Sequence, residues 1–359
     1  MLPRVGIVYV PFKNTRHFPE VVESWRTLTY PKSQIIIYII PNSDPEGMIS
    51  EIERIAREAT SLGLPEIKII ADGKNDGFAG NHNKGIRVAL QDGCEYVFLN
   101  NGDLKLDSRA IDEAVSVAEA DLRIGSVQSL MLYWNEPDTI NAFGGVFHIA
   151  GYGYADGNRT KCSEISFSGT QSIGYASGGA VLYRATAIRE IGLLEEGFFM
   201  YHEDLELGLR LRVAGYENVL APYSVAYHDY HFSVNPGMFR WIETYRYVVA
   251  FAYWRPMTLL FMLPVLLGVE VATWIFALKG GWIMDKIGAM WDLLKPRTWA
   301  LTLRMRMRAK RLRQVKDREL LHYVSGRISA QEQSNWTVEH IANPLLELYT
   351  SFLQIIVIW

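Results

Sequence analysis

The sequence predicts an α/β protein with a mostly parallel sheet flanked by helices, followed by a C-terminal membrane-associated helical region. Short β-branched apolar runs alternate with segments of helical period from residue 5 to residue 99. This alternation is typical of a parallel sheet with right-handed crossovers. A long apolar run at 256–278 and a basic run at 304–318 come later. The 359 residues are enough for two domains, which we place at 1–240 and 241–359.

Turn residues divide the first part of the chain into elements. Pro11 halts the first strand, and the Pro-Asn-Ser-Asp-Pro segment at 41–45 halts the second. Residues 135–172 are rich in Gly, Asn, Ser and Thr without a clear period, and they predict an irregular, partly β excursion over the functional side of the sheet. We expect strands at 5–10, 35–40, 67–70, 96–99, 126–132, 175–183 and 216–219, and helices at 18–28, 48–62, 86–90, 107–120, 185–191 and 205–213.

Composition narrows the class of protein. The net charge of -3 argues against a nucleic-acid partner. Cys94 and Cys162 are far apart and lack metal-ligand spacing, which fits a reducing compartment. The first residues lead straight into a strand rather than a signal peptide, so we expect the first domain to stay in the cytoplasm.

The strand at 96–99 ends in two amides, a glycine and an acid: Asn100, Asn101, Gly102 and Asp103. In an open α/β sheet, ligands bind just past the carboxyl ends of strands. An exposed carboxylate and amide there suit Mg²⁺ or Mn²⁺, which prefer oxygen ligands and share their coordination with substrate phosphates. The alternative is an Asx-type turn that only ends the strand.

A glycine-rich segment at 76–85 precedes that strand. Small residues at the start of a helix let backbone N–H groups approach an anion, and Lys84 adds a positive charge. The segment lacks both the Walker spacing and the dinucleotide glycine pattern. A tight loop with a capped helix is the alternative to a phosphate site.

A second acidic cluster, Glu203 and Asp204, follows a run of aromatic residues. Burial against aromatic side chains raises a carboxyl pKa and makes the group a better base near neutral pH. A solvated helix start, where acids complement the helix dipole, is the alternative. Further on, His228 and His231 flank an acid, a pattern that fits either a metal site or a structural pair.

Taken in order, these segments resemble the family 2 glycosyltransferases, inverting enzymes with the Rossmann-like GT-A fold, and especially their rhamnosyltransferase-like branch. The resemblance spans roughly residues 4–232. It is carried by the segments 77–85, 98–103, 177–180 and 198–204 and by His228.

The resemblance implies roles for individual residues. Asp103 is the metal-binding acid, with Asn101 in the first position of a D-x-D-like motif and His228 completing a site for Mn²⁺ or Mg²⁺. Asp204, beside Glu203, is the catalytic base. The donor-binding residues implied are Pro11, Asn42, Asp44, Asp76, Gly77, Phe78, Gly80, Asn83, Lys84 and Asn100, and the acceptor-binding residues are Ser177, Gly178, Gly179, Tyr201 and His202.

Two departures from the family pattern affect these assignments. The family commonly ends its second strand with an Asp-Asn pair that contacts the nucleobase, whereas this chain reads Pro41-Asn42-Ser43-Asp44. Gly102 interrupts the usual Asn-Asn-Asp run, which leaves open whether Asn100 or Asn101 shares the metal.

The implied reaction is one in-line displacement that moves a sugar from a UDP-, dTDP- or GDP-linked donor to a glycan or polyprenol-linked acceptor. A processive polysaccharide synthase is disfavoured because a Gln-x-x-Arg-Trp motif and several membrane spans are missing from the sequence. A sugar nucleotidyltransferase would need a basic glycine-rich motif after Val10. A catalytically inactive membrane scaffold with the same fold is the rival from another class.

The apolar run at 256–278 is long enough to cross a bilayer, but it contains Pro264, Gly268 and Glu270. A single crossing would separate the basic run from the first domain, although both are expected on the cytoplasmic side. We therefore favour a monotopic or re-entrant pair of helices bending near Pro264 and Gly268, with the basic run against anionic headgroups.

Residues 345–359 predict a second surface-lying helix or a homo-oligomer contact. Tryptophans 254, 274, 282, 291 and 299 are spaced like interfacial anchors.

Overall fold

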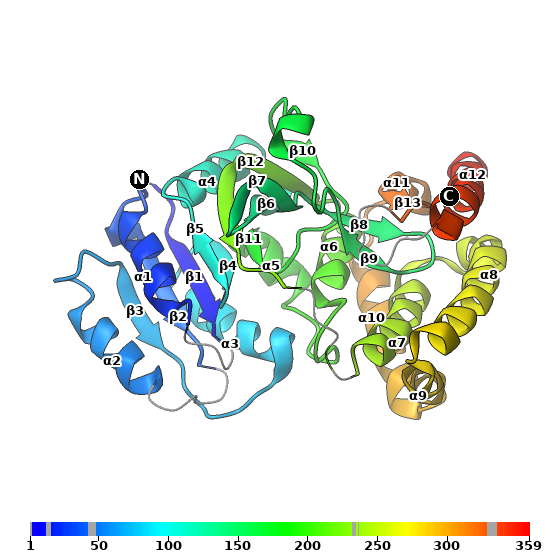
Figure 1. The fold of residues 1–359 in the computed structure, drawn as a ribbon, viewed down its shortest axis with the longest axis horizontal. Coiled ribbons are helices and arrows are strands. Elements are labelled where there is room, and N and C mark those ends of the chain that lie inside the picture. Colours follow the sequence, from blue (N-terminus) through cyan, green and yellow to red (C-terminus); the bar gives the residue numbers. More distant parts are fainter. Residues whose placement is uncertain (1, 12–15, 42–47, 232–234, 236, 329–335) are drawn as a thin grey trace.

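The structure is a computed structural model that describes residues 2–11, 16–41, 48–231, 235, 237–328 and 336–359. The amino-terminal sheet lies at one end of the molecule and the C-terminal helices lie at the other (Figure 1). The strands are β1 (Val5–Val10), β2 (Ile35–Ile39), β3 (Glu66–Ile69), β4 (Tyr96–Asn101), β5 (Leu104–Leu106), β6 (Ile124–Tyr133), β7 (Glu136–Ala142), β8 (Gly145–His148), β9 (Gly153–Ala155), β10 (Gln171–Ser172), β11 (Ala180–Arg184), β12 (Glu217–His228) and β13 (Val324–Ser325). The α-helices are α1 (Phe18–Thr27), α2 (Met48–Glu58), α3 (Gly77–Gln91), α4 (Ala110–Ala120), α5 (Ala185–Ile191), α6 (Glu203–Val213), α7 (Met238–Tyr253), α8 (Pro256–Gly280), α9 (Ile283–Leu293), α10 (Pro296–Leu312), α11 (Asp317–Leu321) and α12 (Asn343–Ile356).

The main sheet has the strand order β10-β12-β6-β11-β4-β1-β2-β3. Its first half, β3-β2-β1-β4, is parallel throughout, as the alternation of strands and helices predicts. Strand β11 then joins antiparallel to both β4 and β6, while β12 returns parallel to β6. The carboxyl ends of β1 and β4 therefore meet at one edge, beside the turn that enters β11.

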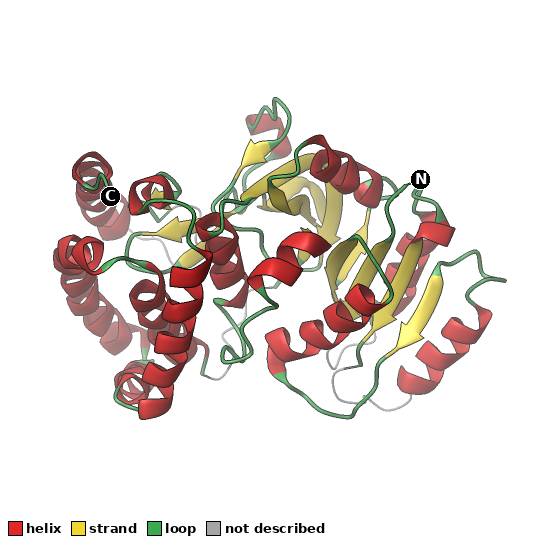
Figure 2. Ribbon diagram, turned by 180° about the vertical axis from the view of Figure 1, so that it is seen from behind, coloured by secondary structure: helices red, strands yellow, loops and turns green. Residues whose placement is uncertain are grey.

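Helices cover both faces of this sheet (Figure 2). On one face α1, α2 and α4 share an apolar core with alternate strand residues, such as Ile7 of β1. On the other face α3, α5 and α6 share a second core with the intervening strand residues, such as Val8. This two-sided burial explains why the parallel strands read as continuous apolar runs in the sequence.

Two elements differ from their predicted bounds. The helix predicted at 86–90 begins at Gly77, so the glycine-rich segment is helical rather than a loop. Its small residues serve close packing: a Cβ on Gly85 would lie 2.5 Å from Val8 Cγ1 and 2.7 Å from Ile40 Cδ1. The strand predicted at 216–219 extends through β12 to His228, because that segment pairs with β5 and β6.

The excursion at 135–172 is partly β, as predicted. It contains β7, β8, β9 and β10, and β8 pairs with β9 and with the distant β13 in a second sheet. The C-terminal helices share a third apolar core with this region, in which Phe147 and Leu205 pack with Met262 and Leu353.

The predicted bend in the apolar segment is wrong, because α8 is one continuous helix from Pro256 to Gly280. Pro264 removes a single backbone hydrogen bond without ending the helix. Among the described residues, α8 is the helix with the length and hydropathy to cross a membrane.

Glu270, in the middle of α8, is paired inside the protein. Its Oε2 lies 2.5 Å from Arg246 Nη2 on α7 and 2.9 Å from Lys286 Nζ on α9. Arg246 and Lys286 are both buried and both also contact Glu243. These four charges fix one side of α8 against α7 and α9.

Replacing Lys286 with Met is expected to lower the free energy of unfolding by about 3–5 kcal/mol, because buried Glu243 and partly buried Glu270 then share a single cation, Arg246. Urea denaturation followed by tryptophan fluorescence measures the change. Lys279→Met, at an exposed position on α8, is the matched control and is expected to change stability by less than about 0.5 kcal/mol. Equal unfolding midpoints for both variants would contradict a stabilising role for the network.

The basic run does not face outward as a whole, so the expectation that all of it contacts headgroups is wrong in part. Arg304 and Arg308 pair with buried Glu195 at 2.7 and 2.9 Å. Arg313 pairs with buried Asp317 at 2.8 Å. These arginines hold α10 and α11 against the rest of the chain.

Candidate active site

The strand-end acid lies beside the predicted histidine. Strand β5 pairs antiparallel with β12 so that Leu104 is opposite His228, and this register brings Asp103 Oδ1 within 3.3 Å of His228 Nε2. The Tyr9 hydroxyl donates to the Gly102 carbonyl at 3.1 Å and fixes the turn between β4 and β5. Two residues far apart in the sequence thus meet at the carboxyl edge of the sheet.

A neighbour fixes the orientation of the His228 ring. Asn141 Oδ1 lies 2.8 Å from His228 Nδ1, and this contact turns Nε2 toward Asp103. Burial would raise the pKa of Asp103, but the hydrogen bond and the charge of the adjacent His228 outweigh it and the pKa is lowered.

This donor set fits a divalent cation that also binds substrate phosphates. Among the described residues, no group of three or more His, Cys, Asp or Glu side chains is arranged to hold a metal ion. One carboxylate and one imidazole, with open positions, match the way Mg²⁺ and Mn²⁺ bind with phosphate oxygens.

The two amides before Asp103 have different surroundings. Asn100 is buried, accepts a hydrogen bond from Trp25 Nε1 at 3.2 Å and donates to the Leu104 carbonyl at 2.8 Å. Its side chain is therefore committed to the interior of the sheet. Asn101 is partly exposed at the strand end and is the amide better placed to share a metal.

Sequence reasoning missed Asp229 as a neighbour of this edge. Its backbone N–H donates to the Asp103 carbonyl at 3.1 Å, and its carboxylate lies 2.9 Å from His17 Nε2. Both Asp229 and His17 are largely buried, so the pair anchors the backbone behind Asp103. In the sequence, Asp229 lies between His228 and His231, and this pattern does not indicate a contact with His17 or with the Asp103 backbone.

The glycine-rich helix start is tied to the segment that precedes the predicted base. Gly77 has φ +72°, and a Cβ there would lie 2.2 Å from the Phe199 carbonyl oxygen. The Phe78 N–H donates to that same oxygen at 2.9 Å. Glycine is therefore required at position 77 to bring the two segments together.

The other predicted donor-binding residues have different surroundings. Lys84 Nζ lies 2.8 Å from carboxylate oxygens of both Asp72 and Asp76 at the mouth of the segment. Asn83 is buried and bonds both backbone groups of Leu194, so its side chain holds α3 to the following loop. Pro11 is buried at the end of β1 and Gly80 is buried in the first turns of α3, while Asn42 and Asp44 lie outside the described residues.

A strained turn positions the second acidic cluster. Tyr201 and His202 have φ values of +69° and +67°, a left-handed conformation that is costly for residues with a Cβ. His202 is buried and its Nε2 contacts the Gly151 carbonyl at 3.1 Å, which holds the turn in place. Helix α6 then starts at Glu203 and points Asp204 toward Gly178.

The loop at 177–179 joins the two acidic sites. The Gly178 N–H donates to Asp204 Oδ2 at 3.2 Å, while the Gly179 carbonyl accepts from the Asn101 N–H at 3.0 Å. The Ser177 N–H donates to Gln128 Oε1 at 2.8 Å. This short loop therefore links the segment that carries Asp103 to the segment that carries Asp204.

The two acids of the cluster differ in access. Burial raises the pKa of Asp204, and burial together with the Asp204 charge raises the pKa of Glu203 well above its ordinary value. The predicted pKa increase is confirmed for both. Glu203 is buried, and within the described chain its Oε2 has no hydrogen-bond partner, whereas Asp204 is partly exposed. Asp204 is the acid that a substrate can reach.

Aromatic side chains flank the turn before Asp204, and Trp241 on α7 is one that sequence reasoning missed. Its ring lies 5.5 Å from Phe199 and 6.3 Å from Tyr201, measured between centroids. The Tyr201 hydroxyl also accepts a hydrogen bond from Asn235 at 2.8 Å.

Comparison with known proteins identifies the family. A sequence model described as glycosyltransferase like family 2 matches residues 3–244. An N-acetylglucosaminyl-diphospho-decaprenol L-rhamnosyltransferase from Mycobacterium tuberculosis is 40% identical over 60 residues, covering 16% of this chain and 20% of the relative. Rhamnosyltransferase WbbL from Escherichia coli is 30% identical over 99 residues, covering 25% and 36%. This chain thus matches only about a fifth to a third of the length of these relatives.

Solved structures share the fold. GalNAc-T7 with UDP, GalNAc and Mn²⁺ has a TM-score of 0.58 at 14% identity, covering 71% of this chain and 49% of that chain. The mannosyltransferase PcManGT from Pyrobaculum calidifontis with GDP-Man and Mn²⁺ has a TM-score of 0.51 at 15% identity, covering 86% of each chain. TarS 1–349 from S. aureus has a TM-score of 0.52 at 11% identity, covering 98% of this chain and 88% of that chain. The GT-A fold is thereby confirmed, and the family match over residues 3–244 shows that this chain belongs to the family 2 glycosyltransferases.

Proposed function

We propose that this protein is an inverting, metal-dependent glycosyltransferase that moves a sugar from a nucleotide-diphosphate donor to a glycan or lipid-linked acceptor. The main support is the loop at 177–179, which hydrogen-bonds both to Asn101, beside the proposed metal site, and to Asp204, the proposed base. A donor diphosphate at Asp103 and an acceptor hydroxyl at Asp204 then lie on opposite sides of one reacting carbon.

The residues divide the reaction between them. Asp103 and His228 would hold a divalent cation, with Asn101 at the edge, and such a cation would supply positive charge for the leaving diphosphate. Asp204 takes the proton of the acceptor hydroxyl. The new bond from the acceptor oxygen to the anomeric carbon forms as the bond to the diphosphate breaks, and this single displacement inverts the anomeric configuration.

The ligands and activities of similar proteins support the proposed donor and acceptor classes. The two structures with bound ligands hold UDP or GDP-Man together with Mn²⁺, and the mycobacterial relative acts on a diphospho-decaprenol. We accordingly propose a UDP-, dTDP- or GDP-linked donor, Mn²⁺ or Mg²⁺ as cofactor, and a glycan or polyprenol-linked acceptor.

Thermal denaturation with a panel of nucleotide sugars tests this function. The matching donor with Mn²⁺ is expected to stabilise the protein by about 2.7 kcal/mol at a hundred times its Kd, and less without the metal. Release of free nucleoside diphosphate with that donor then distinguishes a transferase from an inactive scaffold. Stabilisation by none of the donors, with or without metal, would contradict the proposal.

We also propose that the C-terminal helices hold the protein on the cytoplasmic face of the membrane with α8 lying in the membrane plane. Helix α8 is attached along its length: Glu270 bonds buried charges on α7 and α9, and Thr258 accepts from Trp359 Nε1 at 2.9 Å. A crossing α8 would carry those charges into the hydrocarbon. Large exposed apolar residues on these helices include Met257, Leu260, Leu263, Leu267, Val271, Ile275, Phe276 and Leu278 on α8 and Leu345, Leu348, Phe352 and Ile355 on α12.

Both ends of α8 are therefore expected on the same side of the membrane. In a background with Cys94 and Cys162 replaced by Ala, a single cysteine at Lys279, in the last turn of α8, should react only with reagent on the cytoplasmic side of sealed vesicles. Arg311→Cys, exposed at the end of α10, is the control for that side. Labelling of Lys279→Cys only from the opposite side would establish a true crossing.

A further inference from the structure

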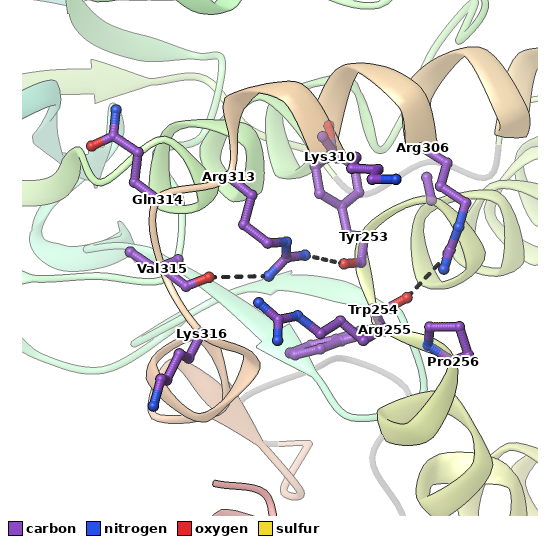
Figure 3. Close-up of a pocket in the computed structure, with 12 residues that line it drawn as sticks. Tyr253, Trp254, Arg255, Pro256, Arg306, Lys310, Arg313, Gln314, Val315 and Lys316 are labelled. Atoms are coloured by element: carbon purple, nitrogen blue, oxygen red, sulfur yellow. Dashed lines mark hydrogen bonds between the residues drawn. The ribbon is translucent and has the colours of Figure 1, made fainter. Parts of the chain in front are cut away.

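A cavity of about 620 Å³ lies where α7 passes into α8 and α10 passes into α11 (Figure 3). It shares no residue with the candidate active site. Its lining contains no acidic residue, although the whole chain carries a net charge of -3. The five basic residues of this basic pocket are Arg255, Arg306, Lys310, Arg313 and Lys316.

Two of the arginines are held in place by backbone carbonyls. Arg306 donates to the Trp254 carbonyl at 3.1 Å, and Arg313 donates to the Tyr253 carbonyl (Figure 3). Buried Asp317 pairs with Arg313 at 2.8 Å and with Arg255 at 3.9 Å, and it accepts from Thr258. This single carboxylate does not balance the five basic side chains, so the pocket keeps a net positive charge.

The two lysines complete the pocket from the solvent side. Lys310 and Lys316 are exposed, and among the described residues neither ammonium group has a carboxylate within ion-pair distance. Lysine binds phosphate as a mobile point charge, whereas arginine offers a fixed pair of donors. This combination suits a phosphate group that enters from outside.

The pocket opens at the start of an apolar surface. Helix α8 begins at Pro256 on the pocket wall, so the positive end of its dipole adds to the basic charge. The exposed apolar stripe of α8 starts one residue later, at Met257, and continues through Leu260 and Leu263. A ligand with a phosphate at one end and a hydrocarbon chain at the other matches both features.

We propose that the basic pocket binds the phosphate headgroup of an anionic membrane lipid, whose chains lie against the apolar stripe of α8. This inference rests on the membrane association proposed above and adds a specific headgroup site to it. The site fixes which end of α8 lies at the headgroup level, and thereby sets the orientation of the catalytic unit on the membrane.

The test compares two variants that lose the same charge. Lys310→Gln/Lys316→Gln removes the two outer cations of the pocket, and Arg311→Gln/Arg318→Gln removes two exposed cations next to it in sequence. Binding is measured by sedimentation with phosphatidylcholine vesicles, with and without phosphatidylglycerol. The pocket variant is expected to lose roughly tenfold or more in affinity for the anionic vesicles, and the control roughly threefold or less. An equal loss in both variants would show diffuse charge attraction and overturn the site.

Further measurements distinguish the headgroup site from the alternative explanations. Unfolding midpoints equal to that of the parent show that both variants are folded. If the parent binds neutral and anionic vesicles equally well, the membrane association stands and the headgroup site is wrong. If the parent binds neither, the membrane association itself is wrong. Stabilisation of the parent by inorganic phosphate alone, lost in the pocket variant and without any preference for anionic vesicles, would assign the pocket to a free anion instead.

Discussion

Replacing Asp204 with Asn is expected to lower kcat by roughly two to four orders of magnitude, with little change in donor affinity. Asn keeps the shape, but its single Oδ1 accepts only one of the two hydrogen bonds that Asp204 accepts from Gly178 and Leu205, and it does not take a proton. A base acts in the transition state, so its loss affects turnover rather than ground-state binding. Steady-state transfer rates and donor titration by calorimetry measure the two quantities separately.

The neighbouring acid provides the matched control. Glu203→Gln removes the other carboxylate of the cluster, which is buried and has a raised pKa. Because Glu203 faces the interior, its variant is expected to keep kcat within about tenfold of the parent. A larger loss in Glu203→Gln than in Asp204→Asn would mean that the base has been assigned to the wrong acid.

The pH dependence of the parent enzyme gives a second test of Asp204. Burial raises the pKa of its carboxyl group above the ordinary value of 3.8, and the base works only when deprotonated. Activity should therefore fall as the pH drops through this raised pKa, so that the acid limb of kcat/KM lies above the usual range for an aspartate. The residual activity of Asp204→Asn should lack that limb.

The sequence was sufficient to predict the parallel half of the sheet, because each strand there is a continuous apolar run bounded by turn residues. The meeting of Asp103 with His228 was predicted only by resemblance, since it depends on the pairing of β5 with β12. Helix α3 was misjudged because glycine weakens isolated helices, whereas here Gly85 lets the helix pack closely on β1.

The residues that sequence reasoning missed are partners created by tertiary structure. Asn141 orients His228 from within a segment that has no periodic pattern. Trp241 packs on Phe199, in the turn before Asp204, from α7, outside the first predicted domain. Likewise Arg308 is used in an ion pair with Glu195, which no local pattern indicates, so the basic run looked more exposed than it is.

Replacing Asp103 with Ala is expected to abolish metal-dependent donor binding while leaving the fold intact. The Asp103 side chain is 44% exposed and lies at a strand end, so its removal leaves no cavity in the core. Asp103 is one of the two side chains, with His228, that we propose to hold the cation. Losing it should weaken Mn²⁺-dependent donor binding by more than about the 10–100-fold expected for a residue that only orients a ligand.

Calorimetry of the nucleotide-sugar donor with and without Mn²⁺ measures the effect, and the unfolding midpoint checks the fold. Asp107→Ala, which removes another carboxylate from the same connection, is the control and should bind the donor like the parent. If Asp103→Ala keeps metal-dependent binding, Asp103 is not a ligand. If it loses binding equally with and without the metal, Asp103 contacts the donor directly. Metal dependence that disappears only in Asp103→Ala ties the cation to the carboxyl edge of β4, because Asp103 and His228 converge there.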